Sequence, residues 1–213
     1  MFGRLLRHPA PILCALLAVY SAALAGLELR TSQDHVRPYF TDIEGEVLFH
    51  AVNTTLSVAL LAGAALLLLF AALNRRGPGE GARAFLAGQA AMFALLAFDD
   101  RFQLHERLGY RLGFPDHYVM LAWAAAGVGL LLLYWRSPHV SRRLTGLFLA
   151  GTGLFAVMLG FDALAPHDMV LRLSLEDLAK TWAAAMFFAF AWEAARLQLG
   201  RDGDEVRTGL SRS

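Results

Sequence analysis

The stretch Ala84–Glu106, AFLAGQAAMFALLAFDDRFQLHE, decides how the chain can fold. Its residues up to Phe98 are apolar or small apart from Gln89, and such a segment is difficult to keep in water. It ends on two adjacent carboxylates, Asp99 and Asp100, followed by a histidine and a glutamate. Ionisable groups at the end of a membrane segment are costly to hold there, so we expect them to belong to a functional site.

The composition of the whole chain indicates the same class of protein. Of its 213 residues, 57% are hydrophobic and 17% are charged, and the formal net charge is +1. Several separate apolar segments in a chain of this length are typical of a multi-pass membrane protein formed by one helical bundle. The near-neutral charge and the scattered arginines exclude nucleic-acid binding. The single cysteine, Cys14, excludes an intrachain disulfide and a thiolate cluster.

We therefore expect an all-α integral membrane protein with about six transmembrane helices in one up-down bundle. The apolar segments place these helices at about residues 9–28, 46–73, 83–100, 117–135, 144–164 and 175–195. Residues 1–195 then form the bundle, and residues 196–213 form a polar cytoplasmic tail. Ala23-Leu24-Ala25 also fits the cleavage site of a signal peptide, but the length of the first apolar segment favours a retained anchor.

The basic residues predict the orientation of this bundle. If both termini are cytoplasmic, twelve Lys and Arg residues fall inside and six fall outside, as the positive-inside rule requires. Most acids and histidines fall at the opposite ends of the helices. An up-down order brings these ends to one face, so we expect a cell-membrane protein with a polar site on the extracytoplasmic side.

The candidate site collects polar side chains from five helix ends. Glu46, His50 and Asn53 share one face of the second predicted helix. The remaining members are Asp99, Asp100, His105, Glu106, His117, Asp162, His167, Glu176 and Lys180. On a continuous helix Asp99 and Glu106 would share a face, and His105 would lie about 120° away from it. Either the helix bends there, or these residues serve two different neighbours.

The sixth predicted helix carries the only lysine of the chain, Lys180. An ion pair with Glu176, one turn earlier, would neutralise both groups within the membrane. Lys180 could instead reach Asp99 or Asp162 on other helices. The residues Ser174-Leu175-Glu176-Asp177 resemble a capping box, which places the start of this helix near Leu175.

The chemistry of the candidate site favours a metal ion. Imidazoles and carboxylates are natural ligands of Zn, Fe and Mn. We expect one divalent transition metal, with His50, Asp100, His105 and His167 as its candidate ligands. Asp99, Glu106 and Glu46 are then the candidates for acid–base catalysis beside it. The alternative is that these histidines are only hydrogen-bond partners, because their spacing matches no known zinc motif.

These residues predict a metal-dependent membrane hydrolase that cleaves an amide or ester of a lipid or lipid-linked substrate. The expected partners are the bilayer, such a substrate and a second copy of the chain. His50 on one helix and Asp99 on its neighbour distantly resemble the alkaline-ceramidase and progestin-receptor-like membrane hydrolases, which implies the same activity. Those families carry further histidines late in the chain, whereas here only His167 precedes a last helix without a histidine pair.

Two other classes of function stay open at the level of sequence. A proton- or ion-coupled transporter subunit would use the buried acids, His50 and Lys180 as a relay. The cytoplasmic halves of the predicted helices are almost purely apolar, and no inverted repeat is evident, which disfavours transport. A non-catalytic membrane assembly or sensor protein would use the same polar groups to hold its helices together or to bind a partner.

Overall fold

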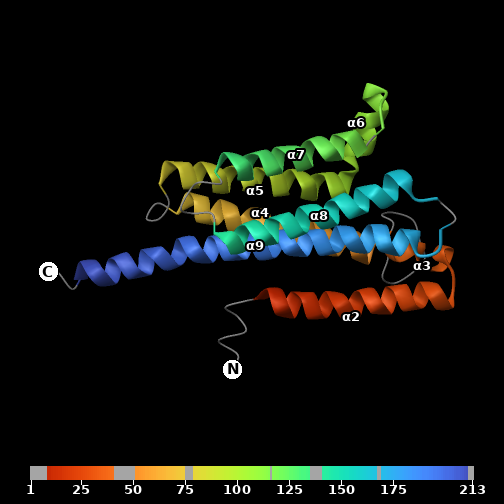
Figure 1. Ribbon diagram of the computed structural model, residues 1–213, viewed down its shortest axis with the longest axis horizontal. Coiled ribbons are helices and arrows are strands. Elements are labelled where there is room, and N and C mark those ends of the chain that lie inside the picture. The colour runs from red at the N-terminus through yellow and green to blue at the C-terminus, as the bar shows by residue number, and fades with distance from the viewer. Residues whose placement is uncertain are drawn as a thin grey trace.

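A computed structural model describes residues 9–40, 51–74, 79–115, 117–134, 141–166 and 169–210. All regular structure within these residues is helical. The elements are α2 (Pro9–Arg30), α3 (Gln33–Phe40), α4 (Val52–Leu73), α5 (Glu80–Phe102), α6 (Leu104–Leu112), α7 (His117–Leu133), α8 (Arg142–Leu164) and α9 (Arg172–Leu210). Figure 1 shows the long helices lying side by side along one axis, with α6 turned away from it at one end.

Four of these helices, α2, α4, α5 and α8, are long and apolar enough to cross a membrane. A fifth candidate is the pair of α6 and α7, if the two helices form one span bent by 118°. Each of the four has the twenty or so residues that a bilayer requires. The prediction of an all-helical membrane protein is therefore confirmed. The helix α9 does not belong to the four, because its apolar part also carries Lys180 and Glu193.

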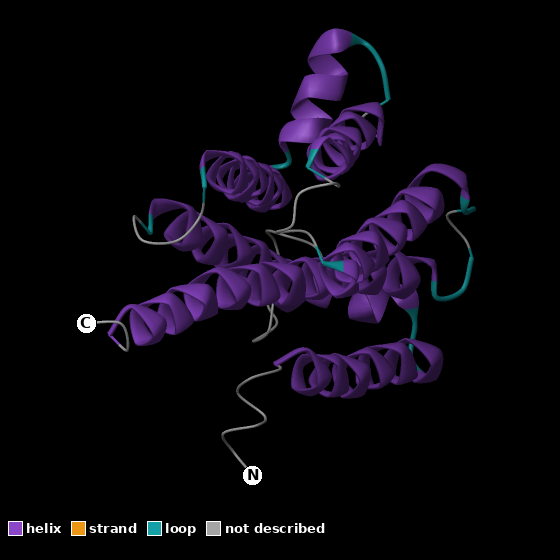
Figure 2. Cartoon of the chain, turned by 60° about the vertical axis from the view of Figure 1, so that its left-hand side comes forward, coloured by secondary structure: helices purple, strands orange, loops and turns teal. Residues whose placement is uncertain are grey.

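The helix α9 nevertheless occupies the middle of the bundle. It packs closely against α4 and α8, and less extensively against α2. Figures 1 and 2 show α2 on one side of this group and α7 on the other. The contact face of α9 is rich in alanines that are almost fully buried, namely Ala183, Ala184, Ala185 and Ala191. Such small side chains let neighbouring helices approach closely, so α9 can carry charges because its neighbours screen it from lipid.

Four phenylalanines fill the centre of the bundle and connect α5, α8 and α9. Phe93, Phe148, Phe187 and Phe190 have ring centroids between 5.0 and 6.5 Å apart. The ring of Phe187 lies directly over Gly151 of α8, where an added Cβ would come within 2.6 Å of it. The close approach of α8 and α9 therefore requires glycine at this position.

The start of α9 differs from the prediction. The helix begins at Arg172, so Ser174 is inside it, and the predicted capping box is wrong. The cap comes from α2 instead, where the buried carboxylate of Glu28 accepts the backbone N–H of Leu171 at 3.1 Å and the hydroxyl of Ser174. A carboxylate is favourable at a helix N-terminus because it meets unpaired N–H groups and the positive end of the helix dipole.

Two further segments are more helical than the sequence predicted. The helix α9 continues beyond residue 195 to Leu210, through most of the predicted polar tail. The polar sequence of residues 30–45 predicts a loop with at most one amphipathic turn, whereas the structure contains the short helix α3 there. The division into a bundle of residues 1–195 and a separate tail stays a prediction.

Candidate functional site

The site is built around a break between α5 and α6. Gln103 separates the two helices and adopts a left-handed conformation, with φ 52° and ψ 46°. Such values are uncommon for a residue other than glycine. The N–H of Gln103 still donates to the backbone oxygen of Asp99 at 2.7 Å, which closes the last turn of α5. Of the two alternatives for this stretch, the structure therefore contains the bend.

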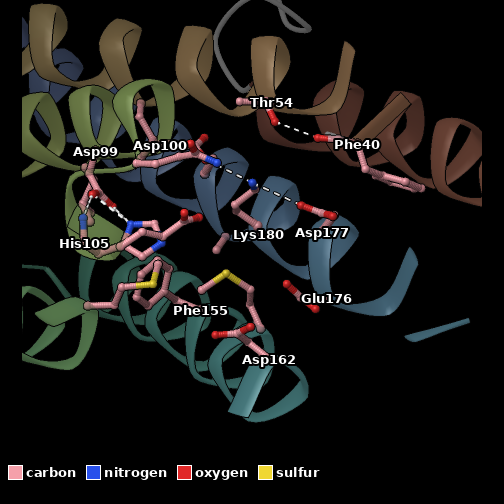
Figure 3. Close-up of a pocket in the computed structure, with 18 of the residues that line it drawn as sticks. Phe40, Thr54, Asp99, Asp100, His105, Phe155, Asp162, Glu176, Asp177 and Lys180 are labelled. Carbon is pink, nitrogen blue, oxygen red and sulfur yellow. Dashed lines mark hydrogen bonds and ion pairs between the residues drawn. The ribbon is translucent and has the colours of Figure 1, made fainter. Parts of the chain in front are cut away.

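The break lets Asp99 bind the start of the next helix. Its Oδ1 accepts the backbone N–H of His105 at 2.7 Å, and its two oxygens lie 2.9 and 2.8 Å from the Nδ1 of the same histidine. Figure 3 shows this pair beside a cavity. A carboxylate that accepts Nδ1–H selects the imidazole tautomer in which Nε2 is the proton acceptor. A single side chain thus caps α6 and orients the imidazole.

The neighbouring carboxylate, Asp100, faces the other way and binds Lys180 of α9. Lys180 Nζ lies 3.0 Å from Asp100 Oδ1 and 3.1 Å from Asp177 Oδ1, and the hydroxyl of Ser57 in α4 donates to the other oxygen of Asp100. The predicted partners of Lys180, which were Glu176, Asp99 and Asp162, are therefore wrong. The reason is the break at Gln103, because it commits Asp99 to α6 and leaves Asp100 facing α9.

Arg172 joins the end of α8 to the start of α9. Its Nη2 lies 3.4 Å from Glu176 Oε2 and 3.8 Å from Asp162 Oδ1, and it also donates to the backbone oxygen of Asp162 at 3.3 Å. Glu176 thus pairs with an arginine one turn before it, and Lys180 is not its partner. This i, i+4 pair was detectable in the sequence, but the predicted start of the helix at Leu175 excluded Arg172 from it.

Asn53 fixes α4 against two other helices. It is fully buried, and its Nδ2 donates to the backbone oxygen of Asp177 at 3.0 Å. Its Oδ1 accepts the hydroxyls of Thr181 at 2.7 Å and of Tyr20 at 3.4 Å. A buried amide with its hydrogen bonds made stabilises the contact of helices in an apolar environment. Asn53 was predicted as part of the polar cluster, whereas Thr181 and Tyr20 were not.

A cavity of about 260 Å³ opens between these groups, and we call it the acidic cavity. Its polar lining consists of Thr54, Asp99, Asp100, Gln103, His105, Glu106, Asp162, Glu176, Asp177 and Lys180. Its apolar lining includes Leu61, Leu96, Met120, Phe155, Met158 and Phe187. Figure 3 shows that the labelled acids and Lys180 come from the ends of several helices. A cavity with polar groups at one part and an apolar remainder suits an amphiphilic ligand.

Most of the predicted site residues that the structure describes meet in this cavity. They are Asp99, Asp100, His105, Glu106, Asp162, Glu176 and Lys180. Asn53 does not line the cavity, but its side-chain amide donates to the backbone oxygen of Asp177, which does line it. His117 at the start of α7 does not line it, and its ring packs against Tyr118 with centroids 4.5 Å apart. Glu46, His50 and His167 lie outside the described residues.

The predicted metal site therefore rests on residues of which only two are described. Among the residues that the structure describes, no three histidine, cysteine or acidic side chains are placed to hold a metal ion together. Asp100 is already bound to Lys180 and Ser57, and His105 is bound to Asp99. The metal and the catalytic roles of Asp99, Glu106 and Glu46 stay predictions.

One functional contact had no signal in the sequence. Glu28 lies near the end of the first apolar segment, and only the packing of α2 against α9 brings it to the N-terminus of α9. A pairing between residues so distant in the chain cannot be inferred from local spacing. The acidic cavity is therefore built partly on a contact that only the tertiary structure reveals.

These features define an all-helical protein with four or five candidate membrane helices and a polar cavity at one end of its bundle. Residues 10–194 match a family described as Domain of unknown function (DUF8692), and the chain belongs to this family. No curated protein and no solved structure matches the chain.

Proposed function

We propose that the protein is a multi-pass membrane hydrolase that cleaves an ester or amide bond of a lipid-like substrate in the acidic cavity. The observation that carries this proposal is the Asp99–His105 pair beside an apolar cavity wall. An oriented imidazole supplies a general base, and the wall supplies the binding surface for an apolar chain. Both are needed for hydrolysis of an amphiphile, and they occur in the same cavity.

The chemistry follows from the tautomer that Asp99 selects. With Nδ1–H donated to Asp99, the Nε2 of His105 takes a proton from a water molecule, and the resulting hydroxide attacks the substrate carbonyl. The imidazolium that forms is stabilised by the buried carboxylate and returns its proton to the leaving oxygen or nitrogen. Glu106 also lines the cavity and is the second candidate for this proton transfer.

A metal ion is an additional part of the proposal. Histidines that bind metals commonly donate their other ring nitrogen to a carboxylate, and His105 has this arrangement with Asp99. His50 and His167 are the further candidate ligands. Elemental analysis of protein purified without a metal-binding tag tests this part, and stoichiometric Zn, Fe or Mn that is lost in His105→Ala is the expected result.

Activity is tested with long-chain esters and amides whose head groups are cationic, neutral or anionic. We expect His105→Ala to lower kcat by about 100-fold or more, which is the usual contribution of a general base. Asp99→Asn leaves a hydrogen-bond partner for the imidazole but removes its charge, so kcat falls without loss of binding. The control is His35→Ala, because His35 is an exposed histidine of α3. Equal turnover by wild type and His105→Ala would contradict the proposal.

We also propose the full topology of six spans in an up-down order, with both termini in the cytoplasm and the acidic cavity on the extracytoplasmic side. The alternating course of the helices in Figure 1 and the distribution of Lys and Arg support it. Two hydrogen bonds of α2, from the Tyr20 hydroxyl to Asn53 Oδ1 and from the Trp182 indole N–H to the Ser21 hydroxyl oxygen, support a retained first span. Single cysteines placed after Cys14→Ser, at residues 76, 114 and 138, should be labelled from the outside only at residue 114.

A second candidate is proton- or ion-coupled transport, and the observation that favours it is the buried ion pairing of Lys180 with Asp100 and Asp177. Charged groups within a membrane bundle commonly mark ion pathways. This candidate predicts pH-dependent flux in proteoliposomes that Asp100→Asn removes. Flux in wild type without any hydrolysis would favour transport over the hydrolase. If variants of these residues change only stability, a non-catalytic assembly or sensor protein becomes the better description.

A further inference from the structure

One buried polar atom in the centre of the bundle has no hydrogen-bond partner. Gln89 of α5 is fully buried, and its Nε2 donates to the backbone oxygen of Gly127 in α7 at 3.2 Å. Its Oε1 accepts no hydrogen bond from the part of the chain that the structure describes. Since a buried carbonyl without a donor is costly in apolar surroundings, this atom marks a place for a group that donates.

The unpartnered oxygen belongs to a second, smaller cavity between α5, α7 and α8, which we call the inner cavity. It has a volume of about 20 Å³, which is room for one small group. Its lining is almost entirely apolar, and the other side chains in it that carry a polar group are Thr152 and Trp123, whose indole N–H does not donate to Gln89 Oε1. The hydroxyl of Thr152 donates to the backbone oxygen of Phe148 at 3.0 Å. Thr152 therefore does not supply the donor that Gln89 lacks.

The inner cavity adjoins the acidic cavity. Three side chains, Leu96, Phe155 and Phe187, line both of them and form the partition between them. Figure 3 shows Phe155 on the α8 side of the acidic cavity. An apolar chain that enters the acidic cavity along its apolar wall meets this partition. A change of rotamer in these three side chains would join the two cavities and open a path to the oxygen of Gln89.

We propose that the acidic cavity binds an amphiphile with a cationic head group and an apolar chain, and that the chain carries a hydroxyl which donates to Gln89 Oε1. This inference rests on the proposed binding of an amphiphile in the acidic cavity. The cationic head follows from the lining, in which six carboxylates accompany one cation, Lys180, and Arg172 outside the lining pairs with two of them, Asp162 and Glu176. The hydroxyl follows from the unpartnered acceptor in the inner cavity.

The positions of the two groups on α5 set the length of the chain. Asp100 and Gln89 are separated by eleven residues of one helix, which corresponds to about 16 Å at the helical rise. An extended chain of about fourteen bonds spans this distance. A hydroxyl at the end of a dodecyl chain is therefore at the correct depth, whereas a hydroxyl on a hexyl chain is too short to reach Gln89.

Binding of non-hydrolysable probes to full-length protein in nanodiscs tests this inference. The probes are dodecylamine, hexylamine and the ω-hydroxylated form of each. We expect wild type to bind ω-hydroxylated dodecylamine about tenfold more tightly than plain dodecylamine, once the different partitioning of the two probes into lipid is taken into account. The reason is that the hydroxyl donates to a buried acceptor. Gln89→Leu should lose this preference and keep its affinity for dodecylamine. Both proteins should bind hexylamine and its ω-hydroxylated form with the same affinity.

The comparison between wild type and Gln89→Leu cancels the difference in partitioning of the probes into lipid, because both proteins are in the same bilayer. Gln33→Leu is the matched control, because Gln33 is in α3 and lines neither cavity. If the hydroxyl has the same effect on binding to wild type and to Gln89→Leu, the inference is overturned and an ordered water is the donor to Gln89. If neither dodecyl probe binds wild type, the proposed amphiphile site fails together with the inference.

Discussion

The polar end and the centre of the bundle hold the same helices together in different ways. At the polar end, α5 and α9 are joined by the ion pair of Asp100 and Lys180 beside the acidic cavity. In the centre, the same two helices meet through the tilted and edge-to-face contacts of the Phe93 ring with the rings of Phe187 and Phe190. An ion pair or a hydrogen bond joins the polar ends of two side chains, so the helices that carry them can stay apart. Aromatic packing needs contact between the rings themselves, so it holds the helices close together.

This difference shows how the bundle can contain a binding site without losing its packing. Close-packed side chains exclude space for a ligand, and they fix the distance between helices. Long polar side chains keep the helix ends apart and leave a cavity between them. The polar end therefore depends on the ion pairs of Lys180 and Arg172, and the centre depends on the shapes of its side chains. The following variants test this distinction, from the largest expected effect to the smallest.

Lys180→Met should have the largest effect on stability. It leaves Asp100 and Asp177 as buried carboxylates without their cation, which typically costs about 3–5 kcal/mol. The free energy of unfolding in mixed micelles measures this loss. Combining Lys180→Met with Asp100→Asn and Asp177→Asn should recover most of it, because no charge is then left unpaired. Arg37→Met is the control, since Arg37 pairs with Asp34 at an exposed position. A Lys180→Met protein as stable as wild type would refute the dependence on paired charges.

Gly151→Ala should have the next largest effect, and it acts on the centre of the bundle. The added methyl group would lie 2.6 Å from the ring of Phe187, and overpacking of this kind costs about 1–3 kcal/mol. Gly153→Ala is its matched control on the same helix, because no atom lies within 4 Å of the added Cβ there. Thermal unfolding of the two variants side by side checks this. Equal melting temperatures would show that α8 and α9 are not in close contact at Gly151.

Asn53→Ala should lower the free energy of unfolding by about 1–2 kcal/mol, because it removes the hydrogen bonds of Asn53 with Thr181 and with the backbone oxygen of Asp177, which join α4 to α9. The control is Thr55→Ala, which changes an exposed residue on the same turn of α4. The effect should be smaller than that of Lys180→Met, since the groups that lose a partner are neutral and the Thr181 hydroxyl can still donate to the backbone oxygen of Asp177. A loss as small as that of Thr55→Ala would mean that the buried amide contributes nothing to the contact of α4 and α9.

Arg143→Ala should have the smallest effect, below about 0.5 kcal/mol. Arg143 Nη1 lies 3.9 Å from Glu193 Oε1, and its side chain is 50% exposed. Glu193 keeps its closer partner, Arg196, at 2.8 Å when Arg143 is removed. Chemical unfolding of this variant beside Lys180→Met compares the loss of a half-exposed cation with the loss of a largely enclosed one directly. Similar losses in both would remove the distinction between the two.

The sequence was sufficient to locate four of the membrane helices, but not to predict which charged side chains pair with one another. The apolar segments predicted α2, α4, α5 and α8 at nearly their observed positions, because a long run of apolar residues has few alternatives to a membrane helix. The acids around Asp99 and the distant Glu176, which the sequence predicted to lie together, line the same cavity, and their role in a site stays a prediction. The expected partners of Lys180 were wrong, because a single left-handed residue at Gln103 sets which of two adjacent carboxylates faces α9.

The sequence by itself determined that this protein is a helical membrane protein with its acids concentrated at the ends of several helices. Hydropathy and the periodicity of the helix act locally, so both can be derived from the order of the residues. Only the tertiary structure decided that Asp99 orients His105, that Asp100 neutralises Lys180 and that Glu28 of α2 caps α9. Each of these contacts joins separate helices or crosses a helix break, and the direction of a side chain there depends on how the helices pack.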